Sequence, residues 1–282
     1  MKRLILLCFV LSALIGCSKQ DLRKWIGKSP WEQPPAVPCT IDSIYPVEKG
    51  HPALNRWTAA GVHYNKKGNP VLVNYQLMHY YLATFSVSYK YDNKDRLIEV
   101  VPSGDPLPDF SYTAPIRIKY VYQGNGQLPV RDTLFSSDGK FVNEVEDLYY
   151  DSYGRINRIV HRNNSYPWPT NYESKYYYDA NGNKQVSLTG NGEIPSVVVY
   201  GDKPSLYSLH PVWRLVHKDY SVNSVKDGAV TYNSKGLPLR VNLNTFFNFQ
   251  SGIFYNRPFL CVENGPDYQL SDISYTCSGS KK

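Results

Sequence analysis

The sequence predicts an all-β protein in which repeated hairpins follow one another in a long antiparallel meander. Two observations lead to this prediction: a Tyr-Asp/Asn-x-x-Gly turn recurs about every 28 residues, and residues that alternate with period two lead into it. A unit of this length holds two strands and a tight turn, so roughly 240 residues provide about 14 to 16 strands. We expect these strands to form a strongly curved sheet or a closed barrel, because either shape protects the strand edges.

The residue types of the turn motif have a physical reason. Asp or Asn at its second position accepts hydrogen bonds from backbone amides ahead of it, and Gly adopts the left-handed conformation that closes a type I turn with a bulge. The strand before a turn alternates, as in Ile118-Lys119-Tyr120-Val121-Tyr122. Four copies keep the full pattern: Tyr64-Asn65-Lys66-Lys67-Gly68, Tyr150-Asp151-Ser152-Tyr153-Gly154, Tyr178-Asp179-Ala180-Asn181-Gly182 and Tyr232-Asn233-Ser234-Lys235-Gly236.

Other units depart from the pattern. Asp95 stands where the second unit should have Gly, and the third unit reads Gln123-Gly124-Asn125-Gly126. The motif tyrosines are separated by 27, 31, 28, 28 and 54 residues, so one degenerate unit is expected near Tyr207. If the protein has a ligand site, we expect it where the repeat is broken, which makes Asp202, Tyr207 and Trp213 candidate ligand-binding residues. The motif tyrosines are Tyr64, Tyr91, Tyr122, Tyr150, Tyr178 and Tyr232.

The N-terminus has the features of an exported, lipid-anchored protein. Lys2 and Arg3 precede an apolar stretch over residues 4–15, which is too short to span a bilayer because spanning needs about 20 residues. Leu14-Ile15-Gly16-Cys17 follows and resembles a bacterial lipobox. We therefore expect residues 1–16 to be a signal peptide and the thiol of Cys17 to carry the lipid that anchors the chain to a membrane.

The next segment, residues 17–38, is predicted to be a tether because it is rich in Pro and poor in large apolar side chains. Ser18, directly after the lipidated cysteine, resembles lipoproteins that are sorted to the outer membrane. Both the periplasmic side and the cell surface remain open as locations. Residues 39–282 are expected to form a single β domain.

The charge of the chain does not indicate a nucleic-acid partner. Without Lys2 and Arg3, 29 basic residues face 24 acidic ones, and the basic side chains are scattered rather than clustered. Export also removes nucleic acid as a routine partner, so none is expected.

Three cysteines remain after processing, because Cys8 leaves with the signal peptide and Cys17 carries lipid. In an oxidising envelope, the simplest arrangement of three cysteines is one disulfide and one free thiol. Cys39 opens the first strand and Cys277 closes the last, and these ends lie side by side if the sheet closes antiparallel. We expect a Cys39–Cys277 disulfide, with Cys261 buried as a small hydrophobic residue.

The turn sequence also resembles known repeat proteins. Tyr150-Asp151-Ser152-Tyr153-Gly154-Arg155 is similar to the YD repeats of Rhs and teneurin shells. The chain from Cys39 onward, together with the lipobox, more closely resembles a group of bacterial lipoproteins of unknown function, mainly of the Bacteroidota type, that are described as having a porin-like fold. The resemblance implies the architecture of the chain and no activity. Charged and amide side chains interrupt almost every strand, so we do not take it to imply membrane insertion.

The sequence contains no recognised motif for catalysis, metal binding or cofactor binding. The six histidines include no H-E-x-x-H and fall in separate hairpins, so no metal and no cofactor are expected. Glu144 and Glu146 share one face of a strand, which is typical of an exposed polar face, although paired carboxylates also do glycosidase work. A hydrolase with an unrecognised site is therefore kept as an alternative.

The function that we expect is that of a lipid-anchored, non-enzymatic binding or scaffold module of the outer envelope. Tyr166 and Trp168 lie in the loop Tyr166-Pro167-Trp168-Pro169 and could present flat rings to sugar faces, so they are further candidate ligand-binding residues. The expected partners are the membrane, through the N-terminal lipid, and a glycan or an envelope protein.

Overall fold

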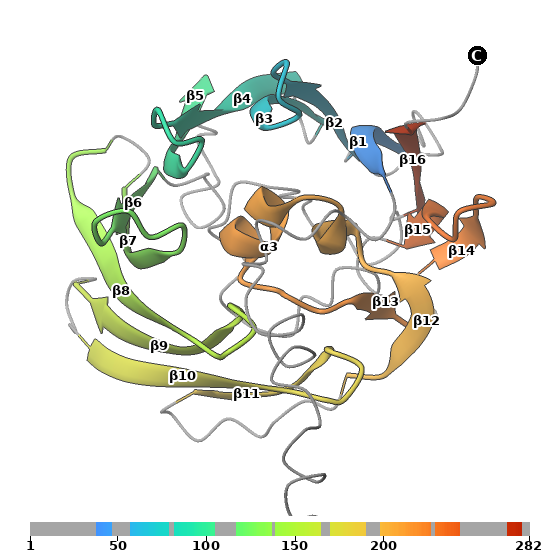
Figure 1. The fold of residues 1–282 in the computed structure, drawn as a ribbon. Helices are drawn as coiled ribbons and strands as arrows, with labels where there is room; N and C mark the ends of the chain where they lie inside the picture. The colour runs from blue at the N-terminus through green and yellow to red at the C-terminus, as the bar shows by residue number, and fades with distance from the viewer. Residues whose placement is uncertain are drawn as a thin grey trace, which may run out of the picture.

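The structure is a computed structural model, and it describes residues 38–46, 57–78, 82–104, 117–136, 139–164, 170–189, 198–226, 229–242 and 270–277. Within these ranges, fourteen strands form one antiparallel sheet, which curves around a short helical segment in Figure 1. The strands of this sheet are β1 (Cys39–Pro46), β2 (Trp57–Tyr64), β3 (Pro70–Met78), β4 (Leu82–Tyr91), β5 (Leu97–Gly104), β6 (Ile118–Tyr122), β7 (Pro129–Phe135), β8 (Val142–Tyr150), β9 (Ile156–Asn163), β10 (Thr170–Tyr178), β11 (Lys184–Thr189), β14 (Ala229–Tyr232), β15 (Pro238–Asn242) and β16 (Leu270–Cys277).

The strand order confirms the predicted all-β meander. Strands β1 to β11 are neighbours in space in the order of the chain, and β16, β15 and β14 continue the sheet on the other side of β1. The sheet is strongly curved but not closed, because β11 and β14 are its two edges. A separate pair, β12 (Tyr200–Pro204) and β13 (Asn223–Val225), lies between these edges in Figure 1.

The first and last strands are joined covalently. Cys39 and Cys277 are register partners on β1 and β16 and form a disulfide, which confirms the predicted pairing. The bond spans 238 residues of sequence, so it strongly restricts the unfolded chain. Cys261 and Cys17 lie outside the described residues.

The repeated turns have the predicted geometry. Asp151 Oδ1 accepts hydrogen bonds from the amides of Tyr153 and Arg155, both at 2.9 Å, and Gly154 has a φ of 72°. Asp95 takes the same left-handed conformation with a φ of 59°. The hairpin therefore forms even with Asp95 in place of Gly, because the short polar side chain of Asp tolerates the left-handed backbone conformation.

The motif tyrosines bind the neighbouring strand through their hydroxyl groups. Tyr150 donates a 2.8 Å hydrogen bond to the carbonyl of Pro129, and Tyr178 donates one of 2.9 Å to the carbonyl of Ile156. The guanidinium group of Arg155 lies 4.1 Å from the ring centroid of Tyr178, so each unit also contacts the next.

The degenerate unit near Tyr207 forms helices in place of a hairpin. Here the chain leaves β12, forms the 3₁₀ helix η1 (Leu206–Leu209) and the helix α3 (Pro211–His217), and returns through β13. Both helices lie on the concave side of the curved sheet in Figure 1. The described residues include no helix that is both long and apolar enough to cross a bilayer.

We call residues 198–226 the insert. It is tied to the β11 edge, where the amide of Lys184 donates to Ser221 Oγ at 3.1 Å and the amide of Asn223 donates to Asn183 Oδ1 at 2.9 Å. Its side chains are part of the protein core, since Trp213 is 0% exposed and its ring meets that of Tyr89 edge-on at 5.6 Å. The insert therefore packs against the concave side of the sheet through buried side chains.

Candidate functional site

The structure places three of the five candidate ligand-binding residues. Asp202 is exposed and pairs with Lys203 at 2.9 Å, whereas Tyr207 and Trp213 are buried in the insert. These three residues do not share a surface, so the structure does not bring them together as one site. Tyr166 and Trp168 lie outside the described residues.

Local capping explains why the insert turns helical. Ser205 accepts a hydrogen bond from the amide of Tyr207 at the start of η1, and His210 Nδ1 accepts one of 3.2 Å from the amide of Val212 at the start of α3. Pro211 follows at the first turn of α3, where its missing N–H costs little. Burial lowers the pKa of His210 to about 4, so its ring is neutral and can accept this bond near neutral pH.

A buried lysine ends α3. Lys218 has a φ of 53°, a left-handed conformation that helix ends usually give to Gly. Its Nζ lies 2.8 Å from Asp132 Oδ2 on β7 and also contacts the carboxylate of Glu146 on β8. All three side chains are at most 4% exposed. The C-terminal end of α3 is thus joined to the sheet by paired buried charges, since unpaired ones would be very costly there.

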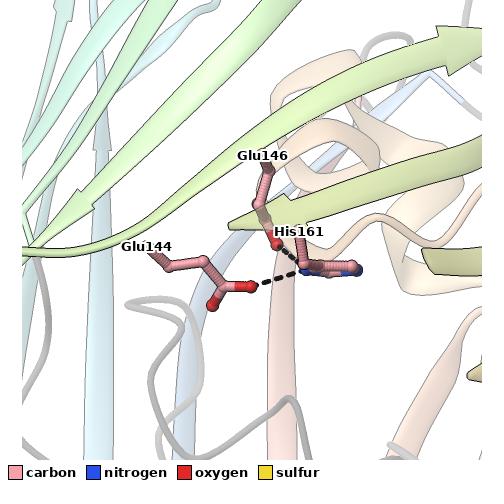
Figure 2. Close-up of side chains that lie close together, drawn as sticks. All are labelled: Glu144, Glu146 and His161. Carbon is pink, nitrogen blue, oxygen red and sulfur yellow. Dashed lines mark hydrogen bonds and ion pairs between the residues drawn. The ribbon is translucent and has the colours of Figure 1, made fainter. Parts of the chain in front are cut away.

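A second polar cluster shares Glu146 with the contacts of Lys218. Glu144 and Glu146 project from β8 toward His161 on β9, as Figure 2 shows. His161 Nδ1 lies 2.6 Å from Glu144 Oε1 and 3.3 Å from Glu146 Oε1. One ligand atom from each of the three residues lies within 4.8 Å of the others. We call Glu144, Glu146 and His161 the carboxylate–imidazole cluster.

Strand β10 holds the histidine ring from the other side. Ser174 Oγ lies 2.9 Å from His161 Nε2, and the ring of Tyr172 stacks on the imidazole at 4.1 Å with an interplanar angle of 6°. The hydroxyl of Tyr172 also donates a 3.1 Å hydrogen bond to Glu144 Oε1. The ring of His161 therefore has a fixed orientation, with Nδ1 facing the carboxylates.

The order Ser174, His161, Glu144 is also the order of a hydrolytic triad, in which a hydroxyl, an imidazole and a carboxylate bond in series. Ser174 is however 0% exposed, and its strand is paired on both sides, opposite Ile159 and Thr189. In this structure a substrate carbonyl cannot approach the Ser174 hydroxyl. The arrangement therefore orients His161 and does not display a nucleophile.

The sequence does not predict this cluster, and the strand face of Glu144 and Glu146 is interpreted from it as an exposed polar face. That interpretation was wrong for Glu146, which is 0% exposed. The signal was present in the hairpin register, because the turn after Tyr150 makes Glu146 and His161 direct cross-strand partners. Period two shows which residues share a face, but not which face turns inward.

Of the comparisons with known proteins, only the one with solved structures finds proteins that are similar to this chain. No family model matches the chain, and no curated protein matches it. The chain is similar to a porin-like protein from Bacteroides uniformis ATCC 8492, with a TM-score of 0.46, 9% identity, and coverage of 87% of this chain and 100% of that chain. It is also similar to TcdB2-TccC3 without its hypervariable C-terminal region, with a TM-score of 0.30, 13% identity, and coverage of 66% of this chain and 9% of that chain. Likenesses at these TM-scores assign neither a family nor a function.

Proposed function

We propose that the chain is a lipid-anchored protein of the bacterial outer envelope that acts as a non-enzymatic binding or scaffold module. The anchor is supported by the sequence, in which Lys2, Arg3 and an apolar stretch precede the lipobox cysteine Cys17. The scaffold role is supported by one structural observation. The insert lies on the concave side of the sheet, and its residues Trp213, Leu215 and Val216 are all 0% exposed. Partners are therefore expected on the outer face of the sheet or on its loops.

The anchor is tested by expressing the full chain and its Cys17→Ser variant in a diderm bacterium with labelled palmitate. We expect the wild type to carry label and to fractionate with the outer membrane. The variant should lose both properties. Absence of label from the wild type would contradict the proposed lipid anchor. So would a variant that still fractionates with the membrane. Protease treatment of intact cells then distinguishes the cell surface from the periplasmic side.

A second candidate function is the binding of a glycan or another extended polymer. It is favoured by exposed rings on the sheet and its turns, since Tyr149, Tyr153 and Tyr177 are 42%, 58% and 51% exposed. Flat exposed rings of this kind can stack on sugar faces. The test is a glycan array of the full chain with Tyr177→Ala and Trp168→Ala as variants. Binding that both variants leave unchanged would remove these rings from the proposal.

A further inference from the structure

We propose that the carboxylate–imidazole cluster of Glu144, Glu146 and His161 binds a divalent first-row transition metal ion, with Zn²⁺ and Mn²⁺ as the best candidates. This inference goes beyond the proposed function and does not rest on it, because it concerns the interior of the sheet. The site would be formed by two adjacent strands, β8 and β9, and would lie beside Lys218 at the C-terminal end of α3.

The positions of the ligand atoms match what one metal ion requires. Ligands bound to one ion at about 2.1 Å are themselves separated by about 3.0 to 3.4 Å. His161 Nδ1 and Glu146 Oε1 are 3.3 Å apart, which is within this range. His161 Nδ1 and Glu144 Oε1 are 2.6 Å apart, so this pair would have to separate by less than about 1 Å. Glu144 can move in this way, because its side chain is 14% exposed while those of Glu146 and His161 are each 1% exposed.

The groups around the cluster orient its atoms for a metal. In the tautomer that carries its proton on Nε2, His161 would donate to Ser174 Oγ, and the lone pair of Nδ1 would point at the two carboxylates. Metal-binding histidines are commonly fixed in this way by a hydrogen bond on the far nitrogen. Lys218 contacts Oε2 of Glu146 and leaves Oε1 directed at the imidazole. Oε1 of Glu146 and Oε1 of Glu144 therefore converge on one ring nitrogen, while Lys218 contacts the other oxygen of Glu146.

The mixture of donor atoms indicates which metals the cluster would bind. Imidazole nitrogen favours zinc, iron, nickel and copper, whereas carboxylates alone favour magnesium, calcium and manganese. One imidazole with two carboxylates therefore favours Zn²⁺ or Mn²⁺ over Mg²⁺ or Ca²⁺. The partly exposed Glu144 marks the side from which an ion would enter.

The test is calorimetric titration of the full mature chain with ZnCl₂, MnCl₂, MgCl₂ and CaCl₂ after treatment with a chelator. We expect one equivalent of Zn²⁺ or Mn²⁺ to bind and to raise the melting temperature, with Mg²⁺ and Ca²⁺ at least about 10-fold weaker. Glu144→Gln and His161→Gln should each weaken binding by at least about 10-fold. The matched control is His63→Gln, because His63 is an exposed histidine on β2 away from the cluster.

Three outcomes would overturn the proposal: no saturable binding by the wild type, equal binding by Glu144→Gln, or loss of binding in His63→Gln as well. His161 is buried, so its variant could fail to fold, which circular dichroism would detect. In that case Glu144→Gln, at the partly exposed position, decides the question. Electron paramagnetic resonance of bound Mn²⁺ in wild type and Glu144→Gln provides a second readout, and identical spectra would also contradict the site.

Discussion

Different kinds of contact hold two regions of the molecule in place. One region is the hairpins between residues 57 and 189 that keep the turn motif, and the other is the insert at residues 198–226. In a kept hairpin, the bonds are local: Asp151 binds the amides two and four residues ahead, and Tyr150 binds the adjacent strand. In the insert, the decisive contacts are distant in sequence, as between Lys218 and Asp132. The repeated hairpins thus form the curved sheet, and the segment that interrupts the repeat places apolar side chains and a buried charge on its concave side.

The largest effect is expected from removing the buried ammonium group of Lys218, which follows α3 in the insert. Lys218→Met leaves Asp132 and Glu146 buried without the cation that contacts both, so we expect the free energy of unfolding to fall by about 3 to 5 kcal/mol. Urea unfolding measures this loss. Lys203→Met is the control within the same insert, because it breaks only an exposed pair with Asp202 and should leave the midpoint unchanged.

The next effect depends on pH and concerns His210 at the start of α3. Its pKa is about 4 in the folded chain and about 6.5 unfolded, so the unfolded chain binds more protons between these values. Stability should therefore be complete above about pH 6.5 and fall as the pH drops toward 4, by at most about 1.4 kcal/mol per pH unit.

The matched variant is His210→Asn, because Asn also caps helix starts but does not titrate. Unfolding curves at pH 7 and pH 4.5 should show a smaller pH-dependent loss for the variant than for the wild type. If both proteins lose equal stability over this interval, His210 is not the group responsible.

Within the kept repeats, a smaller effect should follow from Asp151→Ala. The change removes the acceptor for two amides and for Arg155 Nε at 2.8 Å, so we expect a loss of about 2 kcal/mol. Thermal unfolding followed by circular dichroism measures it. Ser152→Ala, at an exposed position of the same turn, is the control. A loss of unfolding free energy as large as that of Lys218→Met would contradict the difference between the local contacts of the hairpins and the distant contacts of the insert.

The smallest effect is expected from restoring the motif in the second unit. Asp95→Gly relieves a non-glycine residue at a φ of 59°, which should stabilise the chain by about 0.5 to 1 kcal/mol. The lost pair with Lys67 is exposed and offsets little of this gain. A raised urea midpoint is the expected readout, and a lowered one would mean that Asp95 stabilises the turn through its side chain.

The same contrast explains how much could be predicted from the sequence. Turns, strands and the disulfide between Cys39 and Cys277 follow from local chemistry and from the register of first and last strands, and they were predicted. The helices of the insert were not, because the spacing near Tyr207 shows only that a unit is degenerate. The burial of Glu146 was not predicted either, since it depends on which face of β8 turns toward Lys218.

The buried charge of Lys218 in the insert should be energetically coupled to the fourteen-stranded sheet of the described residues. A double-mutant cycle of Lys218→Met and Asp132→Asn tests it most directly, with unfolding free energies for the wild type, both single variants and the double variant. We predict a coupling energy of about 1 to 3 kcal/mol between the two positions. A coupling energy within error of zero would contradict the account, because the insert would then be held by apolar packing alone.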